Sequence, residues 1–304
     1  MALSVGVHPW YPAATVGAFR PLLQLLLLAA PLVMLSAADE PLRWGIPSWQ
    51  KSQSLDEIRE QYQPVLEWLG ERIGRRFVVV GGRSYEDMIE LTAQGGVDLA
   101  ALSPVPYVQA KRKNPAVELL ATELKWNEGH TALIDSYEGF IVTLASSGLN
   151  TVADLRGKTV GCVNLESTSG WRYPNAACKA LGLDLARDAK VLYLGSHPRV
   201  TDALVAGSVD AGATWDFTLA EARRKHGDVF RVLLRTEPIP NICLVAHPGL
   251  GADLIARIRE LLPVIDPQVL EKAPMKGYAV RPDSFYDVVR RLVDSEQPTA
   301  PGSK

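Results

Sequence analysis

The sequence predicts an α/β protein of two lobes, each a mainly parallel sheet flanked by helices, with a ligand cleft between the lobes. Short apolar strands alternate with amphipathic helices, the alternation occurs in two successive runs, and an extended apolar segment follows each run. Strand–helix alternation is typical of parallel sheets. Ligands of such sheets bind outside the carboxyl ends of the strands, so two facing lobes predict a cleft lined by strand-to-helix loops.

The first 38 residues have the plan of a secretory signal. Arg20 precedes an apolar run over residues 21–35, and the small residues that follow end at Ala38, before a charged stretch. The run is shorter than the roughly 20 apolar residues of a spanning helix. We therefore expect a cleaved signal over residues 1–38, rather than an uncleaved anchor. No cysteine stands at the cleavage point, so we expect no lipid anchor of the bacterial lipoprotein type.

Composition narrows the partners of the mature chain. After removal of 38 of the 304 residues about 266 remain, with 31 basic residues (32 minus Arg20) against 34 acidic ones and no block of like charge. A nucleic-acid partner normally leaves a basic face or stripe. We therefore expect a small ligand or a protein partner and no nucleic acid.

The three cysteines do not point to a metal site. Cys162, Cys178 and Cys243 lack a close Cys-x-x-Cys spacing, so we expect no bound metal. In an oxidising compartment Cys162 and Cys178 can pair. The alternative is three small, buried, unpaired residues.

The first run predicts one lobe and the second run the other. We expect strands followed by helices at 42–46 and 55–74, 76–80 and 84–94, 97–102 and 104–113, and then at 157–163 and 164–182, 189–194 and 197–207, 209–215 and 216–227. Crossing segments begin near Gly139 and near Pro240, and helices at 254–265 and 284–295 follow the second crossing. The division is therefore lobe 1 over 39–138, lobe 2 over 139–239, and a return to lobe 1 over 240–304. We expect the crossing segments to act as a hinge.

The stretch "NLESTSGWRYPNAACKALG", residues 164–182, places Ser167, Thr168, Ser169 and Gly170 where a helix begins. The first turn of a helix leaves backbone N–H groups free and carries partial positive charge, which favours an oxyanion. Ser167 can instead simply cap the helix. A nucleophilic serine is disfavoured because the stretch lacks a Gly-x-Ser-x-Gly elbow. From the residues alone, the anion cradle and the plain cap both stay open.

Three longer segments carry a family resemblance. They are "GGVDLAALSPVPYVQA", "GFIVTLASSGLNTVADLRGKTVGCVNLESTSGW" and "LGSHPRVTDALVAGSVDAGATWD". Over nearly the whole mature chain the sequence resembles the phosphonate, phosphite and phosphate class of periplasmic binding proteins that serve ABC transporters. The resemblance implies a type II two-lobed fold in the periplasm and the capture of a small tetrahedral oxyanion for a membrane permease. It also implies a monomer with neither catalytic activity nor a cofactor.

The resemblance also implies ligand-binding residues. They are Tyr85 at the start of the second helix, Ser103 in the "ALSPVPY" segment, Tyr137 before the crossing strand, Ser167, Thr168, Ser169 and Gly170, and His197 in "GSHPR". Phenol, hydroxyl and imidazole groups can all donate hydrogen bonds to an oxyanion, and a protonated imidazole adds charge. The alternative for the tyrosines is ordinary packing.

The far end of the pocket should set selectivity. Members that take aminoalkyl phosphonates resemble one another in offering carboxylates to the ammonium group. This chain has Asp216 near one such position, but Asn241 or Ile242 near the second, which argues against an aminoalkyl phosphonate. Trp215, with Trp49 and Trp171, can narrow the pocket. Alternatively, these large aromatics fill the lobe cores.

Three other functions compete with import. A binding protein of this fold can report an oxyanion, such as arsenite, to a membrane sensor kinase. An enzyme would use His197 as base and a serine as nucleophile, but no orienting acid stands at a recognisable spacing. An aromatic cage of tryptophans can hold a quaternary ammonium ion such as choline, which would leave the serine stretch unexplained.

Overall fold

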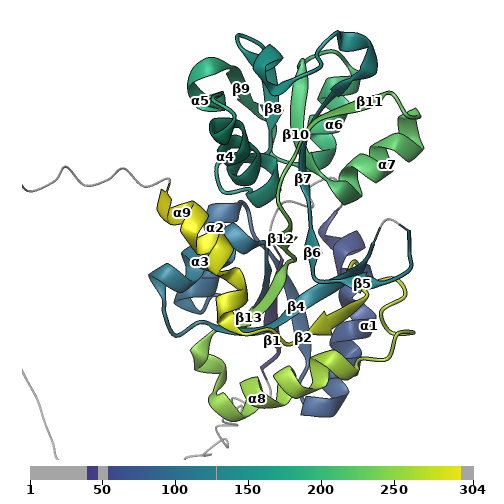
Figure 1. Cartoon of the computed structure of the whole chain (residues 1–304). Helices are drawn as coiled ribbons and strands as arrows, with labels where there is room; N and C mark the ends of the chain where they lie inside the picture. Colours follow the sequence, from purple (N-terminus) through teal and green to yellow (C-terminus); the bar gives the residue numbers. More distant parts are fainter. Residues whose placement is uncertain (1–39, 47–53, 128, 296–304) are drawn as a thin grey trace, which may run out of the picture. The chain divides into compact units, whose positions relative to one another are not determined.

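The computed structural model describes residues 40–46, 54–127 and 129–295 (Figure 1). The predicted signal over residues 1–38 and Trp49 lie outside these residues. The described residues form a seven-stranded sheet, a five-stranded sheet and a two-stranded ribbon. We call the seven-stranded sheet with its helices lobe 1 and the five-stranded sheet with its helices lobe 2.

Lobe 1 has a mixed sheet. Its strands are β1 (Leu42–Ile46), β2 (Phe77–Gly81), β3 (Leu99–Leu102), β4 (Glu118–Trp126), β5 (Leu133–Ile134), β13 (Cys243–Ala246) and β14 (Gly277–Ala279). The order is β14-β4-β13-β3-β1-β2, and β5 pairs with β4. Strand β1 pairs in parallel with β2 and β3, as the strand–helix alternation predicts, whereas β13 is antiparallel to both β3 and β4. The reason is the direction of return: Cys243 pairs with Leu102, so β13 enters the sheet at the carboxyl end of β3.

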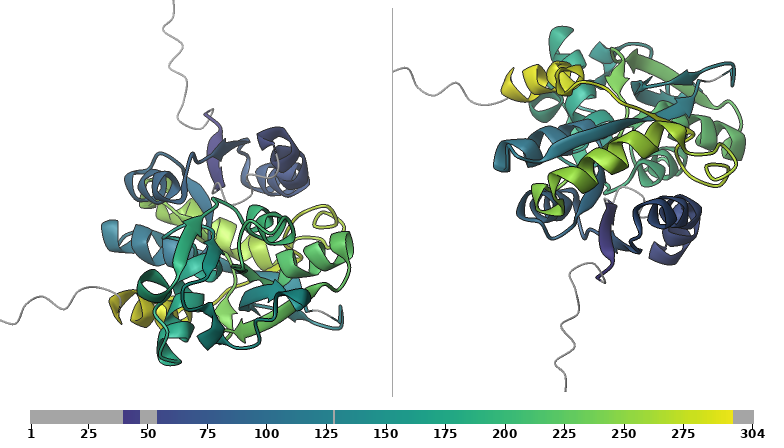
Figure 2. Two further views of the ribbon diagram at one scale, coloured as in Figure 1. Left: turned by 90° about the horizontal axis from the view of Figure 1, so that it is seen from above. Right: turned by 90° about the horizontal axis from the view of Figure 1, so that it is seen from below.

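Helices cover both faces of this sheet (Figures 1 and 2). They are α1 (Leu55–Ile73), α2 (Tyr85–Gln94), α3 (Pro104–Lys113), α8 (Ala252–Leu261) and α9 (Asp287–Ser295), with the short turns η5 (Pro248–Leu250), η6 (Leu262–Val264) and η7 (Asp283–Tyr286). Side chains of α1 and α8 share one buried core with Trp44 and Leu244 of the sheet. Side chains of α2, α3 and α9 share another with Leu102 and Val245. The alternation of Leu244 and Val245 between the two cores follows from the period of two along a strand.

Lobe 2 repeats the same plan. Its strands are β7 (Gly139–Leu144), β8 (Thr159–Cys162), β9 (Lys190–Tyr193), β10 (Ala211–Trp215) and β11 (Phe230–Arg235), in the order β11-β7-β10-β8-β9. Its helical segments are η2 (Ala145–Ser147), η3 (Val152–Leu155), η4 (Thr168–Arg172), α4 (Tyr173–Ala180), α5 (Leu185–Asp188), α6 (His197–Val205) and α7 (Asp216–His226). Strands β8, β9 and β10 pair in parallel, and β7 is antiparallel to β10 because Gly139 enters opposite Trp215, at the carboxyl end of β10.

Capping residues fix where the helices that face the cleft begin. The Ser84 side chain accepts a hydrogen bond from the Asp87 N–H, so α2 starts at Tyr85 after the short turn that follows β2, and Gly95 ends the helix with φ of 76°. Ser103 is the N-cap of α3, with Pro104 as the first helical residue. Both helices therefore begin at the carboxyl edge of the larger sheet.

The chain crosses between the lobes in a paired ribbon. Strands β6 (Ser136–Tyr137) and β12 (Ile239–Pro240) pair antiparallel. Beside them the Thr236 N–H donates to the Gly139 carbonyl at 2.9 Å, and the Gly139 N–H donates to Thr236 Oγ1 at 2.9 Å. The two crossing segments near Gly139 and Pro240 are therefore adjacent, so they can bend as a unit.

The cysteines are all in the described part of the chain. Cys162, Cys178 and Cys243 are each buried with a free thiol, and burial raises the pKa of Cys162 and of Cys178 to about 12. This corresponds to the unpaired alternative. Over residues 40–46, 54–127 and 129–295, no helix is both long enough and apolar enough to cross a membrane.

Candidate functional site

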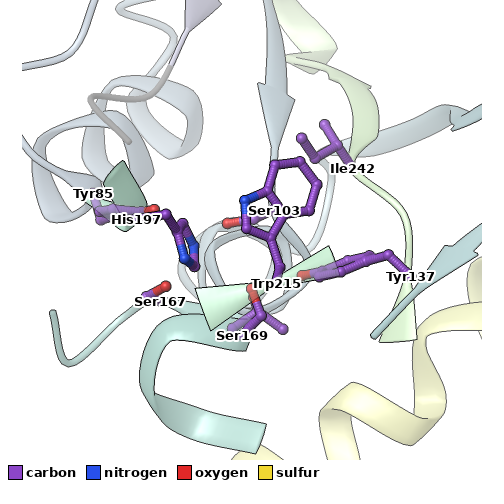
Figure 3. A pocket seen from close by; sticks show the side chains of 9 residues that line it. Tyr85, Ser103, Tyr137, Ser167, Ser169, His197, Trp215 and Ile242 are labelled. Carbon is purple, nitrogen blue, oxygen red and sulfur yellow. The ribbon is translucent and has the colours of Figure 1, made fainter. Parts of the chain in front are cut away.

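A pocket lies where loops of both lobes meet (Figure 3). It encloses about 310 Å³ of empty space, including the part that opens to solvent. Its lining comprises Tyr85, Ser103, Tyr137, Ser167, Thr168, Ser169, His197, Trp215 and Ile242. Among these described lining residues none is Asp, Glu, Lys or Arg, so the pocket carries polar groups without a fixed charge.

Helix starts converge on this pocket. Tyr85 and His197 are the first residues of α2 and α6, and Ser103, Ser167 and Trp215 are the N-caps of α3, η4 and α7. Aligned peptide dipoles place partial positive charge at a helix start, and the first N–H groups lack intrahelical partners. The pocket therefore favours a negative charge although its lining holds no cation.

The serine stretch begins with a π-helical turn. In η4 the Arg172 N–H donates to the Ser167 carbonyl at 3.0 Å, and α4 continues from Tyr173. Ser167 Oγ accepts from the Gly170 N–H at 3.1 Å, so Ser167 does cap the turn. Within the described residues, the N–H groups of Thr168 and Ser169 have no acceptor. The turn thus combines a serine cap with two free backbone donors at the pocket.

The Thr168 hydroxyl is held in place by a hydrogen bond that leaves its own proton available. Thr168 Oγ1 accepts from the Val105 N–H of α3 at 3.0 Å, a hydrogen bond between the lobes. A hydroxyl that accepts an amide proton can still donate its own. Burial raises the pKa of both the Tyr85 and the Tyr137 phenol. The Ser167 hydroxyl lies near enough to the Tyr85 phenol to oppose this rise in pKa, and the Ser169 hydroxyl acts in the same way on Tyr137. The serine stretch therefore contacts lobe 1 and the crossing ribbon while presenting donors to the pocket.

His197 is a neutral hydrogen-bonding group. Its side chain is buried, and burial lowers the pKa of the imidazole to about 3. Its Nδ1 lies 3.4 Å from Thr214 Oγ1, a long contact that leaves the tautomer open. Figure 3 shows the imidazole among the side chains that line the pocket, together with Ser167 and Ser103. The ring therefore serves as an uncharged donor or acceptor rather than as a cation.

The opposite end of the pocket is apolar. Trp215 and Ile242 line it, and the Tyr137 ring meets the Trp215 ring edge-on at 5.5 Å. The Trp215 Nε1–H donates to Thr218 Oγ1 at 2.5 Å, which fixes the indole. Ser103 Oγ, also in the lining, has no hydrogen-bond partner in the described part of the chain. Such an orphan hydroxyl in a buried pocket is available to a ligand.

A comparison with protein families decides the class of the protein. Residues 48–286 match the model of the periplasmic substrate-binding proteins of phosphonate ABC transporters. The chain belongs to this family. Phosphonate-type substrate-binding proteins are transport proteins rather than enzymes. Membership implies an extracytoplasmic location, a small-anion ligand and a membrane permease as partner.

Individual relatives are similar over much of the chain. The phosphate-import protein PhnD of Mycolicibacterium smegmatis is 24% identical over 221 residues, which are 69% of this chain and 68% of that protein. The structure of PhnD1 from Prochlorococcus marinus in complex with methylphosphonate has a TM-score of 0.71 at 16% identity, covering 84% of this chain and 97% of that one. The tetrathionate sensor histidine kinase TtrS of Salmonella typhimurium is 25% identical over 195 residues, 62% of this chain but 32% of the kinase. The chain therefore has the two-lobed fold of this phosphonate-type family.

The structure brings together most of the residues predicted from the sequence. Of the ten, eight line the pocket: Tyr85, Ser103, Tyr137, Ser167, Thr168, Ser169, His197 and Trp215. Gly170 and Asp216 do not. A Cβ on Gly170 would lie 2.3 Å from Val163 Cγ2, so this glycine is needed for packing of the turn. The Asp216 carboxylate accepts from the Phe217 N–H at 2.7 Å in the first turn of α7.

The other predicted selectivity residues also differ in role. Asn241 Nδ2 donates to the carbonyls of Glu123 and Ile134, so Asn241 joins strands while Ile242 lines the pocket. Trp171 lies in the core of lobe 2, which is the packing alternative. In the sequence Ile242 can be recognised only as a replacement for an acid, because its place in the pocket depends on the tertiary structure.

The described residues offer neither a metal site nor a complete acid–base arrangement at the pocket. Over this part of the chain, no group of three or more His, Cys, Asp or Glu side chains is placed to hold a metal ion. Among the described lining residues there is also no carboxylate to orient His197 toward a serine. A Ser–His pair without its orienting group lacks the usual catalytic constellation.

Proposed function

We propose that the protein captures a small tetrahedral oxyanion of the phosphonate, phosphite or phosphate class in this pocket and delivers it to the permease of an ABC importer. The proposal rests on the hydrogen-bond donors in the first turn of η4. There, the free N–H groups of Thr168 and Ser169 and the side-chain hydroxyls meet in an uncharged pocket of converging helix starts. Helix starts of this kind bind phosphate-like anions.

Each part of the anion has a partner in this proposal. The backbone N–H groups and hydroxyls of Thr168 and Ser169 bind oxygens from lobe 2, and Ser103 Oγ binds from lobe 1. The neutral imidazole of His197 adds a further hydrogen bond. Hydrogen bonds to a charged group are about twice as strong as neutral ones, so a few such donors can bind an anion tightly without a salt bridge.

The apolar end of the pocket favours a small ligand without a cationic substituent. Trp215 and Ile242 line this end, and Asp216 is not in the pocket. An ammonium group placed there would be buried without a carboxylate, which is costly. We therefore expect phosphite or methylphosphonate to bind more tightly than aminoethylphosphonate. A structurally similar protein from Prochlorococcus marinus was solved in complex with methylphosphonate, so methylphosphonate is a suitable ligand to test.

A panel of ligands tests the proposal. Thermal melting is measured with phosphate, phosphite, methylphosphonate, aminoethylphosphonate, sulfate, arsenite and choline, each at saturating concentration. A ligand at a thousand times its Kd stabilises the native state by about 4 kcal/mol, so a tetrahedral phosphorus oxyanion should give a clear rise in Tm. Stabilisation by choline and by none of the anions would contradict the proposal.

Oxyanion sensing is a second candidate function. The match to the tetrathionate sensor kinase over 62% of this chain favours it. Import and sensing predict different phenotypes when the gene is deleted. If the protein imports its ligand, deleting its gene should abolish uptake of the labelled ligand. If the protein is a sensor, the deletion should leave uptake intact and abolish the transcriptional response to the ligand.

A further inference from the structure

Lys125 makes a contact between the lobes beside the pocket. It lies on β4 of lobe 1, and its side chain is only 15% exposed. Its Nζ stands 4.6 Å from the centroid of the Trp215 ring, at the end of β10 in lobe 2. Trp215 lines the pocket whereas Lys125 does not. The ammonium therefore touches a wall of the pocket from outside it.

The surroundings of Lys125 come from both lobes. Glu123, two residues earlier on β4, has a carboxylate oxygen 3.9 Å from Nζ. Within the described residues, the Glu123 carboxylate has no hydrogen-bond partner. From lobe 2, Asp216 attracts the ammonium electrostatically, and the Trp215 ring offers its face. Burial lowers the pKa of Lys125, an effect that Glu123 and Asp216 oppose.

These contacts depend on the arrangement of the lobes. Glu123 moves with Lys125 because both lie on β4, so their pairing is kept when the cleft opens. The contact with Trp215 and the attraction to Asp216 join different lobes, so opening the cleft weakens both. A cation over a desolvated indole is attracted more strongly than one in water. The Lys125 contact therefore favours the closed arrangement.

We propose that Lys125 is a positioning residue that clamps Trp215 in the wall of the closed pocket and so raises ligand affinity without touching the ligand. The inference rests on the proposed function, since the clamp acts on a cleft that closes around an anion. In this proposal Lys125, a residue of lobe 1 outside the pocket lining, contributes to ligand affinity in addition to the residues that touch the ligand.

The test compares charge with length at position 125. Binding of methylphosphonate, phosphite and phosphate is measured by calorimetry, and association and dissociation rates by stopped-flow tryptophan fluorescence. For the best-bound of these, Lys125→Met should weaken affinity about three- to thirtyfold, through faster dissociation. Lys125→Arg retains the cation and should recover most of the loss. The melting temperature of unliganded Lys125→Arg, which keeps the cation beside Glu123, should stay close to that of the parent.

Two further variants keep the result interpretable. Lys125→Met leaves the Glu123 carboxylate buried without its cation. The double variant Lys125→Met/Glu123→Gln removes this unpaired negative charge and should show the same faster dissociation. Lys225→Met removes a lysine that pairs with Asp202 at 3.0 Å within lobe 2, and should leave affinity unchanged.

The outcomes separate the clamp from the proposed function. If the parent binds and Lys125→Met binds equally well, the clamp is wrong and the proposed function stands. A loss confined to the association rate would also overturn the clamp, because a contact of the closed state acts after encounter. If the parent binds none of the three anions, the proposed function fails and the clamp fails with it.

Discussion

Ser167, Thr168 and Ser169 are adjacent in the sequence, yet they do different work. Ser167 caps the turn, Thr168 accepts a hydrogen bond from the Val105 N–H of the other lobe, and Ser169 lies near the Tyr137 phenol of the crossing ribbon. The sequence left a cap and an anion cradle as alternatives, and the structure shows that a cap does not exclude free donors. These separate roles could not be predicted from the local sequence, because Val105 lies 63 residues from Thr168 along the chain.

Removing the Thr168 hydroxyl should weaken ligand binding. Thr168→Val keeps the shape but loses both the donor to the anion and the acceptor for the Val105 N–H. We expect a loss of about 1.5–3 kcal/mol, or roughly ten- to hundredfold in affinity by calorimetry. Thr92→Val is a matched control, since Thr92 is equally buried but its hydroxyl donates only to the Met88 carbonyl within α2. Equal affinity of Thr168→Val and parent would refute the role of this hydroxyl.

The buried imidazole of His197 should make the free energy of unfolding depend on pH. Its pKa is about 3 in the folded protein, against an ordinary value of 6.5. Below 6.5 the unfolded chain takes up the proton first, so the folded state loses stability as the pH falls toward 3. His197→Gln lacks this loss. Relative to the variant, the parent should lose on the order of 2–3 kcal/mol by pH 4.5 in urea unfolding. Curves that stay parallel from pH 7 to 4.5 would contradict the buried neutral ring.

At the scale of elements, the strand–helix pattern predicted most of what positions the site. Helix starts after β2, β3, β8 and β10 were expected, and their caps bring the lining residues to one edge of each sheet. The π-helical form of η4 was not predicted. It depends on the packing of Gly170 against Val163, which follows β8, and no local sequence pattern predicts that contact. The antiparallel β7 and β13 were also missed, because their direction depends on which edge the crossing chain enters.

The start of η4 should not tolerate a larger residue at position 170. A Cβ there would lie 2.3 Å from Val163 Cγ2 and 2.6 Å from Val163 Cβ, so Gly170→Ala must displace the turn. Overpacking of this kind costs about 1–3 kcal/mol of stability, and ligand affinity should fall because the donors of Thr168 and Ser169 move. In Gly129→Ala the nearest contact is 3.7 Å from Thr131, so this control should melt like the parent. A fully stable Gly170→Ala with parental affinity would show that the turn is not constrained as described.

At the scale of the molecule, two lobes joined by the β6–β12 ribbon predict closure about the ligand. The ribbon is short, and the lobes meet through hydrogen bonds such as that from the Val105 N–H to Thr168 Oγ1. Small-angle scattering with and without a saturating anion should show compaction on binding, with backbone changes confined to the crossing segments. The forward scattering should correspond to one chain, as the family resemblance implies. An unchanged profile in the presence of confirmed binding would count against the hinge.

We propose that the first turn of η4, together with Ser103 of the other lobe, holds a tetrahedral oxyanion. A crystal structure of the protein with the best-bound anion of the panel is the sharpest test. We expect anion oxygens at about 2.7–3.2 Å from the N–H groups of Thr168 and Ser169. We also expect an oxygen near Ser103 Oγ, and any substituent against Trp215 and Ile242. An anion bound elsewhere, or held in the pocket without contact to Thr168 and Ser169, would contradict it.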